Sequence, residues 1–206
     1  MKKVVIGILD YGVGNTSSVR SSLSALGYRH RLVDSTKDLN LVNGLIIPGV
    51  GAFPNAMKQL IHYDLVEPVK QFAKEGKGIV GICLGMQLLA DISYEQGETR
   101  GLGLIPGEVK AICEPHWHIG WNALNVVQLP LLTDLHGDNF YFNHAYEFCT
   151  QQEYIAGVSH IGRPLASVVY KDNIYGFQFH PEKSQLKGLQ LMDNVMNGLV
   201  NGGVNA

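Results

Sequence analysis

The chain has 206 residues and a net charge of −2, with 46% hydrophobic and 17% charged residues. These values predict a soluble protein with a substantial core, organised as one domain over residues 1–206, and the lack of a long basic run argues against nucleic acid as the main partner. No segment reaches the roughly 18 apolar residues of a membrane span, and the N-terminal apolar run ends at Asp10 without a cleavage site. The odd number of cysteines, three, favours a reducing cytoplasm over a disulfide framework.

The first third of the chain alternates strand and helix patterns. Strands are predicted at Val4–Leu9, His30–Val33 and Leu45–Ile47, and helices at Thr16–Leu26, Ala56–Ile61 and Leu65–Lys74. Asn15 or Thr16 can cap the first helix, and Gly27 can end it. This β-α-β order predicts a parallel sheet with helices on its faces.

The turn after the first strand partly matches a dinucleotide-binding pattern. It contains Gly12 and Gly14, but Ser17 stands where the third glycine is expected, and Asp34 lies near the usual acidic position. Because glycine pairs are common in turns, nucleotide binding is the weaker interpretation. The stronger one is a tight turn that presents its loop at the carboxyl edge of the sheet.

The segment from Gly78 to Ala90 carries the first chemical signal. Its first half is apolar and β-branched, as in a buried strand, and its second half predicts a helix over Leu84–Ile92. Cys83 lies between them, flanked by Gly81 and Gly85. A buried core cysteine is the ordinary interpretation of such a residue. The flanking glycines instead suit a nucleophile at a sharp strand-to-helix turn, where the helix N-terminus favours a thiolate.

A glycine-rich loop, Pro48–Phe53, follows the third strand and precedes the nucleophile segment. The loop is either a simple strand-to-helix turn or a segment whose backbone N–H groups point into a crevice. On the second interpretation, N–H groups near Val50 and Gly51 form half of an oxyanion hole, and the N–H of Leu84 forms the other half.

The rest of the chain is dominated by short strand patterns. A polar, glycine-rich loop is expected over residues 94–101 and another loop over residues 114–122. Strands are predicted at Gly103–Ile105, Glu108–Ile112, Ala123–Val127, Phe140–Glu147, Tyr154–Val158, Ala166–Tyr170 and Ile174–Phe179, and a terminal helix at Gly188–Leu199. His116 and His118 stand two residues apart, but no third ligand follows at a useful spacing, so we expect no metal site.

The second chemical signal is Gly176-Phe-Gln-Phe-His-Pro-Glu182. A buried strand ends at His180, and Glu182 is two residues further on. This spacing can place the Glu182 carboxylate beside the imidazole, where it fixes the tautomer and stabilises the imidazolium. Alone, the motif could be a loop with a solvated charge. Together with Cys83 it predicts a Cys-His-Glu catalytic triad.

Both motifs resemble those of the class I (triad-type) glutamine amidotransferases. The resemblance rests on two sequence motifs, Gly-Ile-Cys-Leu-Gly-Met-Gln (81–87) and Gln-Phe-His-Pro-Glu-Lys-Ser (178–184). Asp10–Asn15, Pro48–Phe53, His118–Asn122 and Tyr141–Tyr146 further resemble the glutaminase subunits of imidazole glycerol phosphate synthases. The resemblance implies an α/β fold with an open, mostly parallel central sheet, flanking helices and an antiparallel section, described as flavodoxin-like.

The resemblance also implies substrate-binding residues. Glu95 is implied to bind the α-amino group of glutamine and Gln87 its α-carboxylate side. His144 is either a strand histidine satisfied by its neighbours or part of a substrate-contacting segment, with contact implied through the backbones of Ala145 and Tyr146. The Pro48–Phe53 loop is implied to flip when the partner signals that acceptor is bound.

The implied activity is hydrolysis of L-glutamine without a cofactor, in a heterodimer. Ammonia passes to a (β/α)₈-barrel synthase subunit that makes imidazole glycerol phosphate and an aminoimidazole carboxamide ribotide in histidine biosynthesis. Three departures from the usual motifs, at Trp117, Asn143 and Ala145, leave open a paralogue that supplies ammonia for amidino groups on surface sugars. A non-enzymatic nucleotide-binding module is a weaker alternative, because the three triad residues are intact.

Overall fold

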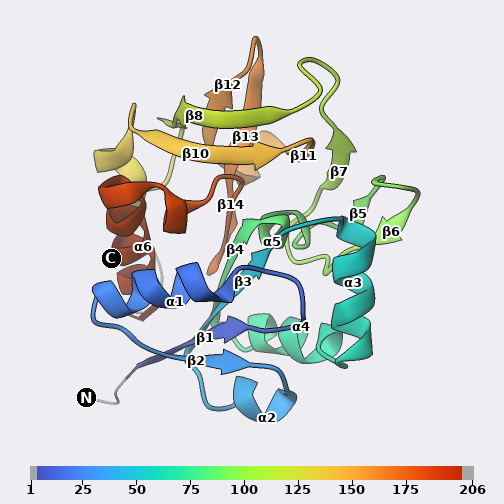
Figure 1. Ribbon diagram of the computed structural model, residues 1–206, viewed down its shortest axis with the longest axis vertical. Coiled ribbons are helices and arrows are strands. Elements are labelled where there is room, and N and C mark those ends of the chain that lie inside the picture. Colours follow the sequence, from blue (N-terminus) through green and yellow to red (C-terminus); the bar gives the residue numbers. More distant parts are fainter. Residues whose placement is uncertain (1–3, 201–206) are drawn as a thin grey trace.

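The structure is a computed structural model that describes residues 4–200. Within this range, an eight-stranded sheet has the order β2-β1-β3-β4-β14-β13-β12-β9 (Figure 1). Its parallel strands are β1 (Val5–Leu9), β2 (Arg29–Val33), β3 (Gly44–Gly49), β4 (Gly78–Cys83) and β14 (Ile174–Phe177). The antiparallel strands are β13 (Pro164–Lys171), β12 (Ile155–His160) and β9 (Asn125–Val126). The predicted α/β class, with an antiparallel section on a mostly parallel sheet, is confirmed.

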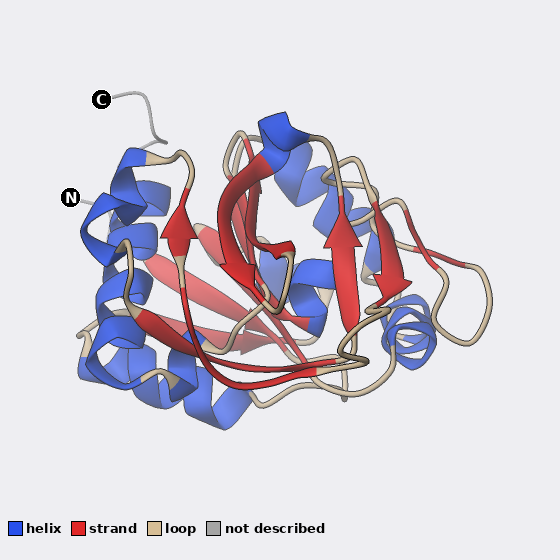
Figure 2. Ribbon diagram, turned by 90° about the horizontal axis from the view of Figure 1, so that it is seen from above, coloured by secondary structure: helices blue, strands red, loops and turns tan. Residues whose placement is uncertain are grey.

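Helices lie on both sides of the sheet (Figure 2). The side chains of α1 (Thr16–Ala25) and α6 (Gln185–Val200) pack in one buried cluster, and those of α3 (Phe53–His62) and α4 (Val66–Lys74) pack in the other. A short helix, α2 (Thr36–Leu39), joins β2 to β3. Among the helices of the described range, none is both long and apolar enough to cross a membrane.

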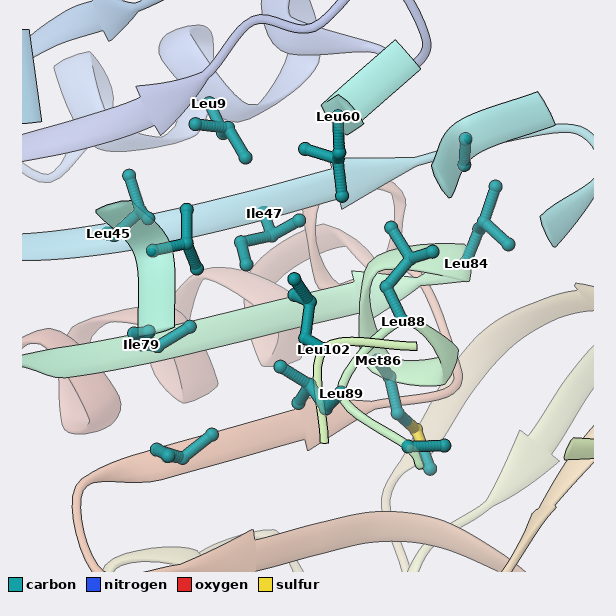
Figure 3. Close-up of a cluster of buried hydrophobic side chains, with 14 of the residues drawn as sticks. Leu9, Leu45, Ile47, Leu60, Ile79, Leu84, Met86, Leu88, Leu89 and Leu102 are labelled. Carbon is teal, nitrogen blue, oxygen red and sulfur yellow. The ribbon is translucent and has the colours of Figure 1, made fainter. Parts of the chain in front are cut away.

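The two clusters follow from the period of two in the strands. In β3, Ile46 belongs to the α1/α6 side, whereas Leu45 and Ile47 belong to the α3/α4 side. Figure 3 shows the α3/α4 cluster, in which Ile47 and Leu60 lie near side chains of the segment after Cys83, including Leu84 and Leu88. Both faces of β3 and β4 are buried, which explains why their sequences are continuous apolar runs.

Two smaller sheets cover the carboxyl side of the central sheet. One pairs β8 (His118–Ala123) with β10 (Asn139–His144), and the other has the order β11 (Tyr146–Cys149), β7 (Glu108–Ala111), β5 (Ile92–Ser93), β6 (Thr99–Arg100). Short 3₁₀ turns cover Pro130–Leu135, Gln152–Tyr154 and Pro181–Lys183. In Figure 1, β8 and β10 run side by side above β4 and β14.

The predicted helix over Leu84–Ile92 is wrong in its length. The helix, α5, covers Leu84–Gln87 only. The Asp91 N–H donates to the Gly107 carbonyl at 2.9 Å, instead of continuing the helical ladder. A tertiary contact therefore replaces helix hydrogen bonds that local propensity alone would favour.

Two strand predictions and one loop prediction also need correction. Residues 103–105 form no strand, because Gly103 has φ +62° and the Leu102 and Leu104 N–H groups donate to the chain after α5. The predicted loop over 114–122 contains most of β8, which gains its partner only in the folded chain. The predicted strand Phe140–Glu147 divides at Ala145 into β10 and β11, which pair with different strands.

Candidate active site

Cys83 lies at a sharp turn where β4 ends and α5 begins. Its φ of +55° is uncommon for a residue with a side chain, and such backbone strain occurs preferentially at functional sites. A Cβ on Gly81 would collide with the Gly85 carbonyl, and a Cβ on Gly85 would collide with the Ile47 carbonyl. The glycines on either side of Cys83 are therefore required by backbone contact. Because α5 has four residues, any partial positive charge that the helix dipole places at its N-terminus comes from a single turn.

The Pro48–Phe53 loop lies directly against this turn. Gly49 is the strand partner of Cys83, and a Cβ on Gly49 would lie 2.8 Å from the Gly85 nitrogen and from Leu84 Cβ. Gly51 has φ +95° with open space beside it, and Val50 is exposed. The N–H of Leu84 belongs to the first turn of α5, where backbone N–H groups lack helical partners. The glycine-rich loop and the first turn of α5, the two segments predicted to supply the oxyanion hole, are thus in contact at Gly49.

Tyr11 holds the base of this loop and was not singled out from the sequence. Its buried hydroxyl donates to the Pro48 carbonyl at 2.8 Å. Burial, and next the nearby Cys83, hold the pKa of Tyr11 well above its usual range, so the hydroxyl keeps its proton. The turn after β1 therefore anchors the glycine-rich loop.

His180 and Glu182 form the predicted pair. His180 Nδ1 lies 2.8 Å from Glu182 Oε1, and both side chains are buried. The backbone of His180 is fixed as well, because its N–H donates to Tyr141 O at 2.9 Å and its carbonyl accepts from Ser184 Oγ at 2.6 Å. Burial alone would lower the pKa of His180, but its interactions with Cys83 and Glu182 outweigh burial and raise the pKa to about 9. The imidazole is therefore protonated at neutral pH.

Replacing Glu182 with glutamine is expected to lower the pKa of His180, because the carboxylate that stabilises the imidazolium is lost. The pKa of His180 is raised above 6.5, so its contribution to stability is full below pH 6.5 and is lost as the pH rises through about 9. An NMR titration of the His180 ring in both proteins measures this shift. An unchanged titration in Glu182→Gln would contradict the coupling.

Gln87, in α5 after Cys83, connects this segment to β11 and to the chain before His180. Its Nε2 donates to the Tyr146 carbonyl at 3.0 Å and to Gln178 Oε1 at 3.1 Å. Gln178, two residues before His180, is fully buried and was not predicted as a site residue. Cys83 Sγ contacts the Asn143 carbonyl at 3.9 Å. The segment between β10 and β11 therefore forms one wall beside Cys83.

Glu95 lies in the loop after β5, and its carboxylate reaches the first residue of α3. Its Oε2 accepts from the Phe53 N–H at 2.8 Å, and burial raises the pKa of its carboxyl against the opposing effect of that hydrogen bond. The structure thus joins Glu95 to the end of the glycine-rich loop. No group of three or more His, Cys, Asp or Glu side chains among residues 4–200 could hold a metal ion.

The site has an exposed aromatic border. The rings of Tyr141 and His180 have centroids 6.4 Å apart, and the ring of Trp121 lies 6.0 Å from that of Tyr141. Trp121 is 51% exposed and shares a surface groove with Leu186, which is 80% exposed. Two exposed apolar side chains, Trp121 and Leu186, therefore lie in a groove of otherwise polar residues, separated from His180 by the ring of Tyr141.

Comparison with known sequences identifies the family. The family described as glutamine amidotransferase class-I matches residues 7–197. The chain is 43% identical over 195 residues to the imidazole glycerol phosphate synthase subunit HisH of Desulfitobacterium hafniense, covering 92% of each chain. It is 44% identical over 190 residues to the same-named subunit of Lacticaseibacillus casei, covering 90% of this chain and 91% of the relative. The chain belongs to the class I glutamine amidotransferase family.

Solved structures agree on the fold. A crystal structure described as glutamine amidotransferase superposes with a TM-score of 0.75 at 21% identity, covering 95% of this chain and 98% of the other. PurLQS from Thermotoga maritima gives a TM-score of 0.75 at 17% identity, with the same coverage. At these identities the likeness concerns the fold alone.

Proposed function

We propose that the chain is the glutaminase subunit of an imidazole glycerol phosphate synthase, acting as a single amidotransferase domain in the cytoplasm. The observation that carries this proposal is the strained Cys83 turn beside the buried His180–Glu182 pair. The names of the relatives from D. hafniense and L. casei support the choice of synthase. The free state of all three cysteines suits a reducing compartment.

The first half of the reaction forms a thioester. The thiolate form of Cys83, paired with protonated His180, attacks the side-chain carboxamide of glutamine, and the developing oxyanion is held by N–H groups of the Val50–Gly51 segment and of Leu84. The carbon–nitrogen bond then breaks. His180, protonated at neutral pH, gives its proton to the departing nitrogen, which leaves as ammonia.

The second half restores the enzyme. His180 is now neutral and accepts a proton from water as the water attacks the thioester carbon. The carbon–sulfur bond breaks, glutamate leaves, and Cys83 is regenerated. Glu182 keeps the His180 ring in place through both steps by its hydrogen bond to Nδ1.

Glutamine recognition is assigned to the walls of the site. We assign the α-amino group to the buried carboxylate of Glu95. We place the α-carboxylate on the side of Gln87, which shapes that wall of the site through its hydrogen bonds to Tyr146 and Gln178. Backbone groups of Ala145 and Tyr146 complete the contact, in the segment that also touches Cys83 through Asn143.

The proposed partner is a (β/α)₈-barrel synthase subunit in a heterodimer. Free ammonia is protonated at neutral pH, so a glutaminase that feeds a synthesis needs its acceptor site close by. The groove that Trp121 and Leu186 share suits such a partner, because exposed aromatic side chains such as Trp121 are enriched at interfaces.

The surface-sugar alternative keeps the same triad, so the names of the relatives, and not the geometry of the site, favour the histidine-pathway synthase over it. It depended on departures from the usual motifs at Trp117, Asn143 and Ala145. Trp117 is exposed, and Asn143 contacts Cys83 through its backbone carbonyl while its own side chain faces outward. Ala145 lies at the bend between β10 and β11, so it also contributes to the site through its backbone. In the described part of the chain, none of these three side chains makes a hydrogen bond to Cys83, His180 or Glu182.

Glutamine hydrolysis by the purified chain is expected to be slow alone and at least about 100-fold faster with a histidine-pathway barrel and its ribotide, since completing an oxyanion hole is worth about 10²–10³ in kcat. Glutamate release measured with and without the barrel tests this. A barrel from another pathway serves as the control. Equal rates in all three mixtures would contradict the proposed partner.

A further inference from the structure

Two buried histidines lie behind the wall that faces Cys83. His118 on β8 and His144 on β10 are direct cross-strand partners, and both side chains are more than nine-tenths buried. His118 Nδ1 lies 3.1 Å from His144 Nε2. The catalytic steps above use neither ring, so their hydrogen bonds need a separate explanation.

The His144 end of this pair is bonded to a backbone carbonyl and the His118 end to the side-chain amide of Asn122, and these two partners determine which ring nitrogens carry protons. His144 Nδ1 lies 2.7 Å from the Tyr146 carbonyl, which can only accept, so Nδ1 carries the proton and Nε2 accepts. His118 Nδ1 must then donate to His144, which leaves His118 Nε2 as an acceptor for Asn122 Nδ2 at 3.0 Å.

The orientation of Asn122 is equally constrained. Its Oδ1 accepts from the Ala123 N–H at 2.8 Å, and its Nδ2 also donates to the His160 carbonyl at 2.8 Å. Reversing the amide would place its nitrogen against a donor and its oxygen against an acceptor. In each hydrogen bond of the series, the donor is therefore on the side of Asn122 and the acceptor is on the side of Tyr146.

The series requires two neutral rings. A second proton on either ring would set two N–H groups against each other, at His118–Asn122 or at His118–His144. Burial lowers the pKa of both histidines to about 4, which agrees with neutral rings at physiological pH. Stacking of His118 on Phe142, with centroids 4.1 Å apart, keeps the ring in place.

The last acceptor in the series belongs to the active site. The Tyr146 carbonyl takes a hydrogen bond from His144 and a second one from Gln87, one turn after the nucleophile. Its position therefore sets where Gln87 points and how the 143–146 segment lies against Cys83.

We infer that Asn122, His118 and His144 form a directional hydrogen-bond series that positions the Tyr146 carbonyl and the 143–146 segment for glutamine binding. This inference rests on the proposed function. His118 and Asn122 touch neither the reacting atoms nor the substrate, so they are positioning residues. They act by fixing the ring of His144 and, through it, the backbone of the substrate wall.

Two variants of His118 separate this role from simple packing. His118→Phe keeps an aromatic ring to stack on Phe142 but cannot donate to His144. His118→Asn carries a nitrogen about where Nδ1 stands and so retains the donor. The exposed His116, two residues earlier, gives the matched control His116→Phe.

With the barrel partner present, His118→Phe is expected to lower kcat/KM for glutamine about 10-fold or more, mainly by raising KM, because binding is weakened equally in ground and transition states. His118→Asn and His116→Phe should stay within about threefold of wild type. A His118→Phe enzyme equal to wild type, or a His118→Asn enzyme as impaired as His118→Phe, would overturn the inference. Absence of turnover in the wild type would instead overturn the proposed function, and the positioning role with it.

The second test measures which ring nitrogens of His118 and His144 carry protons. A role in packing alone would not determine those positions. Long-range ¹H–¹⁵N spectra of the wild type near neutral pH should show His118 and His144 protonated at Nδ1 only. In Asn122→Asp the carboxylate can only accept, so His118 should hold protons on both nitrogens. Protonation of either wild-type ring at Nε2, or a singly protonated His118 in Asn122→Asp, would overturn the series.

Discussion

Replacing Cys83 with alanine is expected to lower kcat for glutamine hydrolysis by about 10⁴-fold or more, because removing the nucleophile of a triad removes nearly all the chemistry that the triad performs. The Cys83 sulfur contacts the Asn143 carbonyl and raises the pKa of His180, so it lies where the proposed mechanism requires the attacking atom. Glutamate release, measured with saturating glutamine and the barrel partner, gives the rate.

The chain supplies its own controls for this experiment. Cys113 and Cys149 are also free; Cys113 lies in the loop after β7, and Cys149 is the last residue of β11. Alanine at either position should leave the rate within about twofold of wild type, as expected for a residue outside the reacting groups. A Cys83→Ala enzyme with appreciable turnover would show that another group attacks glutamine.

Replacing Gly85 with alanine is expected to cost about 3 kcal/mol or more of the free energy of unfolding, because the new methyl group would overlap the Ile47 carbonyl in the middle of the buried sheet. The obstacle is backbone, so a rotamer change cannot relieve it. Denaturant unfolding followed by circular dichroism measures the loss, and failure to obtain folded protein is the extreme form of the same result.

Gly198 provides the matched control for this substitution. It lies in α6, and the nearest atom to an added Cβ is Leu131 Cδ2 at 3.8 Å. Alanine there should raise the free energy of unfolding by about 0.5–1 kcal/mol, the usual difference between the two residues in a helix. A Gly85→Ala protein that unfolds within about 0.5 kcal/mol of wild type would contradict the close-packing account of the turn.

Much of the architecture could be predicted from local patterns. Continuous apolar runs identified β1, β3 and β4, and the glycines around Cys83 indicated a turn that the structure shows to be enforced by backbone contact. The spacing of two residues between His180 and Glu182 was sufficient to predict their hydrogen bond. These features are local in sequence, so the motif itself contains the physical reason for them.

The features that sequence reasoning missed depend on contacts between distant segments. The helix after Cys83 ends early because Asp91 bonds to Gly107, and β8 forms because it meets β10. Tyr11 reaches the glycine-rich loop across 37 positions, and Gln178 meets Gln87 across 91. Propensity and periodicity carry no signal for such pairs.

The most direct test of the central claim follows the amide nitrogen of glutamine. Wild type or Cys83→Ala is mixed with the histidine-pathway barrel, its ribotide substrate and amide-¹⁵N glutamine, in a buffer that contains unlabelled ammonium. The account predicts ¹⁵N in the imidazole product of the wild-type mixture, little dilution by the unlabelled ammonium, and no ¹⁵N with Cys83→Ala. Unlabelled product with the wild type, or equal labelling with both proteins, would contradict it.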